Sequence, residues 1–590
     1  MKSFLKYTLA TIVGVILSSF ILFLLSFGLL GAMISASDKP VVVRPNSILL
    51  LKIDQTIPDR GSKNPWDVFN PITMSFSPNI GLDEILESIE KAKTDENITG
   101  IYLETGMVSP GISTTVELRN ALADFKKSGK FILCYSNDFI PKFSYYLGTI
   151  ADSLFLNPVG VLEFFGLRSE VTFYKNALDK LGVEMQIIRR GQYKSAVEPY
   201  INEKMSKESR DQILGFLTPI WNEILDGISE ERGLTPEKLN ALADNLTINS
   251  AEAAFSESMI DGIKYTDEIQ DILKELSGLS ADKKLRFMSM ANYSKVPKKR
   301  EHKGLAKDKI AVIYASGVIT FGDGSDGVIG SSKYARVIRK AREDSAVKAI
   351  VLRINSPGGI AMAADHIWRE VELASRVKPV IASMGNVAAS GGYYIAAPAD
   401  TILANPTTIT GSIGAFGRIP NAQKLLNDKI GITFDVAKTN KYADFGSFYR
   451  PLNNAEKQYL EAGIEKTYDE FISRVASGRK MTKEAVDSIA QGRVWSGVDA
   501  MQIGLVDLMG GINEAIAVAS EMAGVDHYRI VSLPVQEDPY QKLIKDLSGN
   551  IKVSLLKKEL GESYQYYKNL KDLVFSSGIQ MEMPYYFDIY

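Results

Sequence analysis

The sequence is poor in the residues that build disulfides and metal sites. Its 590 residues include one cysteine and three histidines, and the formal net charge is −2. A single cysteine excludes an intrachain disulfide, and Cys134, in the apolar run KFILCY, is expected to be a core residue. Because no HExxH or paired CxxC motif occurs, we predict neither a metal site nor a cofactor. The near-zero charge gives no sign of a nucleic-acid partner.

The three histidines are poorly placed for a Ser-His-Asp triad. His302 lies in a basic, polar stretch, and His527 lies in a late segment of the chain. His366 lies within the helix-like run ADHIWRE and is expected to be a partly exposed helix residue. A Ser-His-Asp site is therefore poorly supplied, with catalysis by His366 as the less favoured alternative.

Charged residues are missing from Tyr7 to Ser37. Lys2 and Lys6 precede this stretch, and Asp38 follows it. A helix needs about 20 apolar residues to span a bilayer, whereas the apolar region of a cleaved signal has only about 7–15. We therefore predict a transmembrane anchor at 7–36, with cleavage near the small residues ISAS as the alternative. The preceding lysines place the N-terminus in the cytoplasm and the chain from about Val41 on the far side of the membrane.

The remaining chain repeats itself. The segments YYLGTIADSLFLNP (145–158) and YYIAAPADTILANP (393–406) match, and blocks on both sides of them match in the same order. The sequence thus predicts a domain duplication, with copies at 47–285 and 308–530. The stretch 286–307 is polar, basic and contains proline, as expected of a linker. Residues 531–590 form an extension to which the sequence assigns no role.

Each copy alternates short β-branched runs with longer amphipathic ones. In the second copy we expect buried strands at 309–319, 349–355, 379–384 and 401–405. Helices are expected between them, at 334–344 and 364–376. This alternation predicts an α/β fold with a mostly parallel sheet.

One serine has only small neighbours. In MGNVAASGGYYIAAPAD, Ser390 stands between two alanines and two glycines, just after a predicted strand. A nucleophilic serine needs backbone N–H groups near the oxyanion that it creates, and glycines let them approach. The alternative is a tight packing turn with an incidental serine. The first copy has Lys142, Phe143 and Ser144 at the aligned positions, so this turn is not needed for the scaffold, and a functional role is favoured.

The first copy offers a lysine where the second has none. Lys194, in RRGQYKSAVEPY, is followed by small and apolar residues, and Ala443 is its counterpart in the second copy. A lysine can act as a base if it is kept neutral. Taken alone, Lys194 is most simply a surface lysine. Since one copy has the lysine and the other the serine turn, we expect two half-sites that complete each other across the domain interface.

Four motifs resemble the signal peptide peptidase A family, in its long, tandem-domain form: GQYKSAVEPY, INSPGG, AASGGYYIAAPAD and NPTTITGSIG. The resemblance covers about 40–530. It implies two tandem Clp protease/crotonase-like ββα superhelices, preceded by one transmembrane helix, and a serine endopeptidase with a Ser/Lys dyad. It assigns Ser390 as nucleophile, Lys194 as general base, Gly391 with Gly359 or Gly358 as oxyanion hole, and Ser412 as the residue that orients the lysine.

The resemblance also implies an oligomeric state, a substrate class and a cellular location. It predicts a homotetramer that degrades cleaved signal peptides and similar apolar peptides at the periplasmic face of the bacterial cytoplasmic membrane. The alternatives are a non-catalytic membrane scaffold and a crotonase-like enzyme acting on CoA thioesters. A scaffold has no need of Lys194 and Ser390 together, and a CoA enzyme has no need of an anchor. The loop FGDGSDGVIG at 321–330 lacks the alternating acidic ligands of a calcium site, so we predict an ordinary loop there.

Overall fold

The computed structural model describes most of the chain from residue 41 onward. The described residues are 4–21 except 5, 9 and 20, then 41–62, 69–70, 75–76, 80–298 except 107 and 109, 306–536 except 326, and 579–583. Much of the predicted anchor (7–36) and of the extension (531–590) lies outside this set. Within the described residues, no helix is both long and apolar enough to cross a membrane.

The first copy is built on a six-stranded parallel sheet. Its order is β10 (Gly262–Ile263), β7 (Ser153–Leu156), β5 (Phe131–Ser136), β4 (Ile98–Thr105), β1 (Ser47–Ile53) and β11 (Phe287–Ser289). Cys134 in β5 is fully buried, as predicted. The segment 286–307, which the sequence suggests as linker, contains β11. Because β11 pairs with β1 at the edge of this sheet, this part of the segment belongs to the fold of the first copy.

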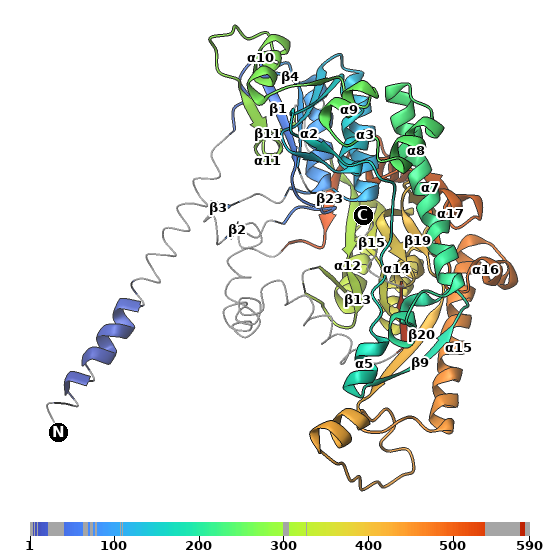
Figure 1. The fold of residues 1–590 in the computed structure, drawn as a ribbon. Coiled ribbons are helices and arrows are strands. Elements are labelled where there is room, and N and C mark those ends of the chain that lie inside the picture. The colour runs from blue at the N-terminus through green and yellow to red at the C-terminus, as the bar shows by residue number, and fades with distance from the viewer. Residues whose placement is uncertain are drawn as a thin grey trace.

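The second copy repeats this order. Its sheet runs β22 (Leu508–Met509), β18 (Thr401–Ala404), β17 (Val380–Ala389), β15 (Val347–Ser356), β12 (Asp308–Ser316) and β23 (Tyr528–Leu533), all parallel. Two short strands, β19 (Ile409–Gly411) and β21 (Val494–Ser496), continue it beside the end of β17. Figure 1 shows the first sheet in the upper part of the molecule and the second below it. The predicted duplication and α/β class are confirmed.

The duplication extends to single hydrogen bonds. An aspartate after each copy's short helix accepts from the first residues of a strand, and a tyrosine in that helix donates to a distant carbonyl. These bonds are Ile132 N–H to Asp152, Val380 N–H to Asp400, Tyr145 to the Met259 carbonyl, and Tyr393 to the Leu505 carbonyl. The two copies therefore share single hydrogen bonds as well as the order of their strands.

Helices cover the sheets of both copies. The helices of the first copy are α2 (Leu82–Thr94), α3 (Ile112–Lys126), α4 (Lys142–Gly148), α5 (Lys175–Leu181), α6 (Glu198–Ile201), α7 (Lys207–Arg232), α8 (Pro236–Asp244), α9 (Ala251–Ser256), α10 (Thr266–Leu276) and α11 (Met290–Tyr293). Of these, α5 lies near the lower end of the molecule, away from the first sheet (Figure 1). Those of the second copy are α12 (Ser331–Glu343), α13 (Ala361–Ser375), α14 (Gly391–Ala396), α15 (Asn454–Arg479), α16 (Lys483–Ile489), α17 (Gly497–Gln502) and α18 (Ile512–Ala523). The predicted helices at 334–344 and 364–376 correspond to α12 and α13. Covered sheets explain why strands such as β12 are apolar along most of their length.

One predicted strand is wrong in its extent. The run 309–319 was expected to be continuous, but the structure divides it into β12 and β13 (Val318–Thr320) at Gly317. This glycine has φ 105°, and a methyl group on it would lie 1.8 Å from the Gly327 carbonyl oxygen. The left-handed backbone turns the chain out of the sheet at this point.

The two copies share a core and a buried ionic cluster. One apolar cluster includes Leu49 and Val116 of the first copy together with Val312 and Val351 of the second. Beside it, Arg353 on β15 is 1% exposed and donates to two first-copy carboxylates. Its Nε lies 2.7 Å from Asp59, and its Nη2 lies 2.6 Å from Glu117. The interface is thus fixed by both packing and paired charge.

A third sheet combines both copies with the C-terminal segment. Its order is β14 (Val328–Gly330), β13, β16 (Gly358–Ile360), β24 (Ile579–Glu582), β20 (Ala415–Asn421) and β9 (Glu184–Arg190). The first-copy strand β9 pairs antiparallel with the second-copy strand β20 along its whole length, and Figure 1 shows the two side by side. This pairing delivers the residues that follow β9 to the second copy.

Candidate active site

Ser390 occupies a sharp turn between β17 and α14. Its backbone has φ 54° and ψ −116°, an uncommon conformation for a residue with a side chain. Two hydrogen bonds hold it: the Ser390 N–H donates to the Gly411 carbonyl, and the Ser390 carbonyl accepts from the Tyr394 N–H, each at 2.8 Å. A methyl group on the neighbouring Gly392 would lie 2.6 Å from the Ser356 carbonyl oxygen. The small residues around Ser390 therefore permit a strained, closely packed strand-to-helix turn.

Lys194 reaches this turn from the other copy. It follows β9, where the Tyr193 N–H donates to the Gln491 carbonyl at 2.8 Å. Its Nζ lies 2.8 Å from the Ser390 Oγ, 2.9 Å from the Ser412 Oγ and 2.9 Å from the Ser412 carbonyl oxygen. All three side chains are 0% exposed. The structure thus brings together the lysine and the serine that the sequence singled out, within one chain.

Burial sets the charge of this lysine. Desolvation lowers the pKa of Lys194 to about 7, against a smaller raising effect of the Glu582 carboxylate. A neutral amine has two N–H donors and one lone pair. The two oxygens of Ser412 can take the two donors, which leaves the lone pair for the Ser390 hydroxyl proton. The arrangement suits a general base that accepts one proton from one oxygen.

Two glycines make room for the lysine, and sequence reasoning missed both. A methyl group on Gly492 would lie 2.7 Å from the Lys194 backbone nitrogen and 2.8 Å from its Cβ. One on Gly414 would lie 3.2 Å from the Lys194 Cδ. Both belong to the second copy, far along the chain from Lys194. Gly414 lies within the quoted motif NPTTITGSIG, but no local pattern shows which side chain it accommodates.

The predicted oxyanion glycines lie together beside Ser390. A methyl group on Gly391 would lie 3.2 Å from the Gly359 backbone nitrogen and 3.2 Å from the Gly358 Cα. The Gly358 N–H is directed to the Ser356 Oγ, at 3.2 Å. Of the two alternatives, Gly359 is therefore the better partner for Gly391. Two convergent N–H groups at a helix start are what an oxyanion needs.

His366 lies apart from the dyad. It is on α13, and its ring centroid is 6.4 Å from that of Phe321. Among the side-chain hydrogen bonds found in the described residues, those of Ser390 involve Lys194 and no histidine. The geometry favours a lysine rather than a histidine as the base.

Comparison with known proteins identifies the family of the chain. The model of "Peptidase family S49" matches residues 124–280 and 372–526, one match in each copy. "Serine protease SPPA, chloroplastic" of Arabidopsis thaliana is 35% identical over 512 residues, covering 86% of this chain and 74% of that protein. "Protease 4" of Haemophilus influenzae is 34% identical over 510 residues (84% and 82%), and "Protease 4" of Salmonella typhi is 35% identical over 527 residues (86% and 83%). The chain therefore belongs to peptidase family S49, in its full-length two-domain form, and is a serine peptidase.

Proposed function

We propose that the chain is a serine endopeptidase in which Ser390 and Lys194 form the catalytic dyad. Neutral Lys194 accepts the Ser390 proton as the Oγ attacks a peptide carbonyl, and the N–H groups of Gly391 and Gly359 stabilise the oxyanion. Lys194 then gives the proton to the departing amine, and water hydrolyses the resulting ester. Ser412 positions the lysine. The observation that carries this proposal is the 2.8 Å hydrogen bond between the two fully buried groups.

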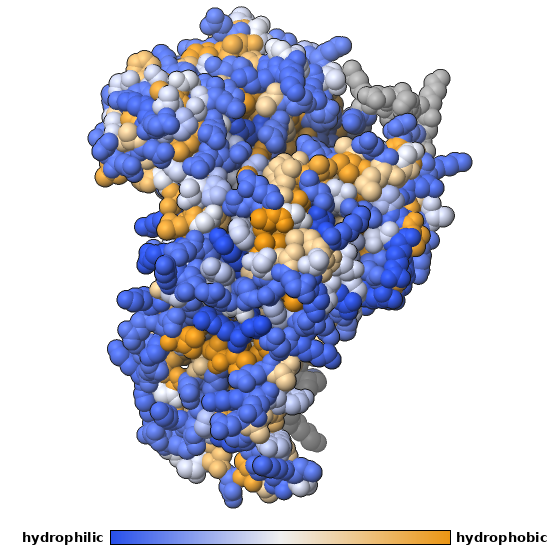
Figure 2. Space-filling view, turned by 90° about the vertical axis from the view of Figure 1, so that its right-hand side faces the viewer, coloured by the Kyte–Doolittle hydropathy of each residue, from blue (hydrophilic) through white to orange (hydrophobic). Residues whose placement is uncertain are grey.

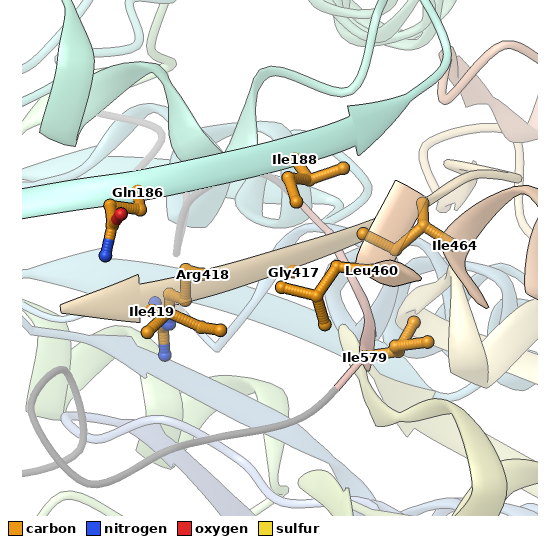
Figure 3. Close-up of a pocket in the computed structure, with 8 residues that line it drawn as sticks. All are labelled: Gln186, Ile188, Gly417, Arg418, Ile419, Leu460, Ile464 and Ile579. Atoms are coloured by element: carbon orange, nitrogen blue, oxygen red, sulfur yellow. The ribbon is translucent and has the colours of Figure 1, made fainter. Parts of the chain in front are cut away.

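The proposed substrates are cleaved signal peptides and similar apolar peptides, at the outer face of a bacterial cytoplasmic membrane. Two features support this choice. The uncharged stretch from Tyr7 to Ser37 is long enough for a single-pass anchor with a cytoplasmic N-terminus. Between β9, β20 and α15, an apolar cavity is lined by Ile188, Leu460 and Ile464 (Figure 3). A reporter fused after Tyr590 should be active only outside the cytoplasm, and cytoplasmic activity alone would contradict the orientation.

The proposed assembly is a homotetramer. The connection between β20 and α15 projects from the lower end of the molecule (Figure 1) and exposes many apolar side chains: Ile430, Ile432, Phe434, Val436, Tyr442, Phe445 and Tyr449. Figure 2 shows further apolar patches, separated by hydrophilic residues, on one face. Exposed apolar groups of this extent are typical of interaction surfaces. Light scattering of the purified protein in detergent should give the mass of four chains; a monomer would contradict the assembly.

Two further readings are less well supported. A non-catalytic scaffold has no use for a buried lysine held against a serine, and burying that amine is costly. A CoA-thioester enzyme has no evident need of this lysine base. Membership of a peptidase family weighs in the same direction.

The dyad is tested by hydrolysis of an internally quenched apolar peptide. Ser390→Ala should lose several orders of magnitude in kcat while remaining folded, because the substitution removes the nucleophile and leaves the fold unchanged. Ser144→Ala is the matched control. This buried serine of the first copy is aligned with Gly392 of the second copy, and its alanine variant should keep the wild-type rate. Unchanged turnover by Ser390→Ala would refute the assignment.

A further inference from the structure

A buried glutamine interrupts the apolar face of the long helix α7. Most buried residues of this helix are apolar and recur at helical spacing, as do Ile213, Phe216, Leu217 and Ile220. Gln212 lies on the same face and is 1% exposed. Burying a polar side chain costs free energy unless its hydrogen bonds are made. The partners of Gln212 therefore show what its burial achieves.

Two of these partners flank Lys194. The Gln212 Nε2 donates to the Ser195 Oγ at 2.6 Å and to the Tyr193 carbonyl oxygen at 3.1 Å. These two residues directly precede and follow Lys194 in the chain. The Ser195 hydroxyl in turn donates to the Tyr193 carbonyl oxygen at 3.0 Å. The turn that carries the lysine is thus closed by its own hydrogen bonds and tied to α7 on both sides of the lysine.

The third partner belongs to the second copy. The Gln212 Oε1 accepts from the Val494 N–H at 3.3 Å. Arg493 precedes Val494, and its carbonyl oxygen accepts from the Ser412 N–H at 2.6 Å. Ser412 is the residue whose two oxygens lie 2.9 Å from the Lys194 Nζ. One amide therefore joins the turn that carries the lysine to the segment that holds the partner of the lysine amine.

Packing of α7 alone does not explain this choice of partners. The helix already buries Phe216, Ile220 and Ile224, each at most 1% exposed, and an apolar side chain of similar length would continue that face. The Gln212 amide instead uses both N–H donors and its oxygen, and all three bonds end beside Lys194 or Ser412. A buried polar network with every group paired favours one arrangement of the residues around it.

We propose that Gln212 is a positioning residue for the base of the dyad. This inference rests on the proposed dyad. The Gln212 amide holds the turn 193–195 and the segment 492–494 in one register, which keeps the Lys194 Nζ aligned with the Ser390 Oγ. Among the described residues, no hydrogen bond of Gln212 reaches Ser390 or the oxyanion glycines. Gln212 therefore acts on the proton transfer only through Lys194.

Hydrolysis of the quenched apolar peptide by the full chain tests this, with kcat and KM measured from about pH 5 to about pH 9. Gln212→Met keeps the length of the side chain and removes its hydrogen bonds. Its kcat should fall about 100-fold, as expected of a catalytic group displaced by about 1 Å, while KM stays within about two-fold. Burial lowers the pKa of Lys194 to about 7. Because a looser turn admits water to the lysine, the midpoint of the kcat/KM profile should move to higher pH.

Two further variants complete the series. Ser209→Ala is the matched control, because Ser209 lies one turn earlier on the same face, is 0% exposed, and its hydroxyl has no hydrogen-bond partner among the described residues. Its kcat, KM and pH midpoint should equal those of the wild type. Gln212→Glu covers the case in which Gln212→Met does not fold. It keeps the shape and an acceptor for the Val494 N–H, and its carboxylate should lower kcat and raise the pH midpoint by about one unit.

The outcomes separate this role from simple packing and from failure of the dyad. A folded Gln212→Met or Gln212→Glu with the wild-type kcat would overturn the positioning role. A loss of kcat with an unmoved pH midpoint, or an equal loss in Ser209→Ala, would also overturn it, because either result would assign Gln212 to the general packing of α7. Lys194→Ala is measured in the same series. If that variant keeps the wild-type rate, the dyad itself is wrong.

Discussion

The pH dependence of catalysis follows from the buried lysine. With a pKa of about 7, Lys194 is neutral in about one molecule in a hundred at pH 5, in about half at pH 7, and in nearly all at pH 9. Only the neutral amine can accept the Ser390 proton, so kcat/KM should rise with pH. We expect a gain of about fifty-fold from pH 5 to 7 and of about two-fold more by pH 9.

The assay is kcat/KM for a quenched apolar peptide that has no titrating group between pH 5 and 9. An ordinary lysine, with a pKa near 10.4, would give a steady rise through pH 9 and no plateau. Lys194→Arg should be inactive at every pH, because a guanidinium stays protonated. A flat profile, or an Arg variant that keeps most of the wild-type rate, would refute the lysine base, and His366 would be the next residue to test.

Three more variants probe the construction of the site. Ser390→Gly should have a free energy of unfolding about 1 kcal/mol higher than Ser390→Ala, and therefore a higher melting temperature, because only glycine relieves the strain of the positive φ. A lower melting temperature for Ser390→Gly would contradict the strain at this position. Gly492→Ala should cost about 100-fold in kcat/KM by displacing the lysine, whereas Gly504→Ala, with the same φ of 80° but open space, should keep the rate. Glu117→Gln should lower the free energy of unfolding by about 3–5 kcal/mol, because it breaks the buried pair with Arg353; a loss under about 1 kcal/mol in thermal unfolding would show that the pair is dispensable.

The duplication, the α/β class and the two residues that the structure brings together, Ser390 and Lys194, could all be found from the sequence. The reason is that each leaves a local trace. Parallel strands leave apolar runs, the serine turn leaves AASGG, and the comparison of the two copies shows where one has a lysine and the other has not. These traces depend only on neighbours in the chain or on the repeat.

The features that could not be predicted from the sequence depend on contacts between residues far apart in the chain. A glycine is required at position 492 because Lys194 packs against it. Arg353 can be buried as a charged residue because it pairs with the carboxylates of Asp59 and Glu117, which come from the other copy. No spacing rule connects residues so far apart. The break at Gly317 was missed because its positive φ depends on the approach of the 327 backbone.

The C-terminal strand did leave a signal, which sequence reasoning passed over. The run Ile579–Met583 alternates apolar and polar residues, as a strand with one buried face does. Nothing in the run states its partner, since strand pairing and register are set by β16 and β20. Its place between β16 and β20 is therefore known from the structure alone.

The central claim is that one buried lysine of the first copy activates one serine of the second. The most direct measurement is the site and rate of covalent labelling by a fluorophosphonate, mapped by peptide mass spectrometry in the wild type and in Lys194→Ala. We predict an adduct on Ser390 in the wild type and a loss of several orders of magnitude in its rate in Lys194→Ala. An adduct on a different serine, or one that forms on Ser390 equally fast without Lys194, would contradict the account.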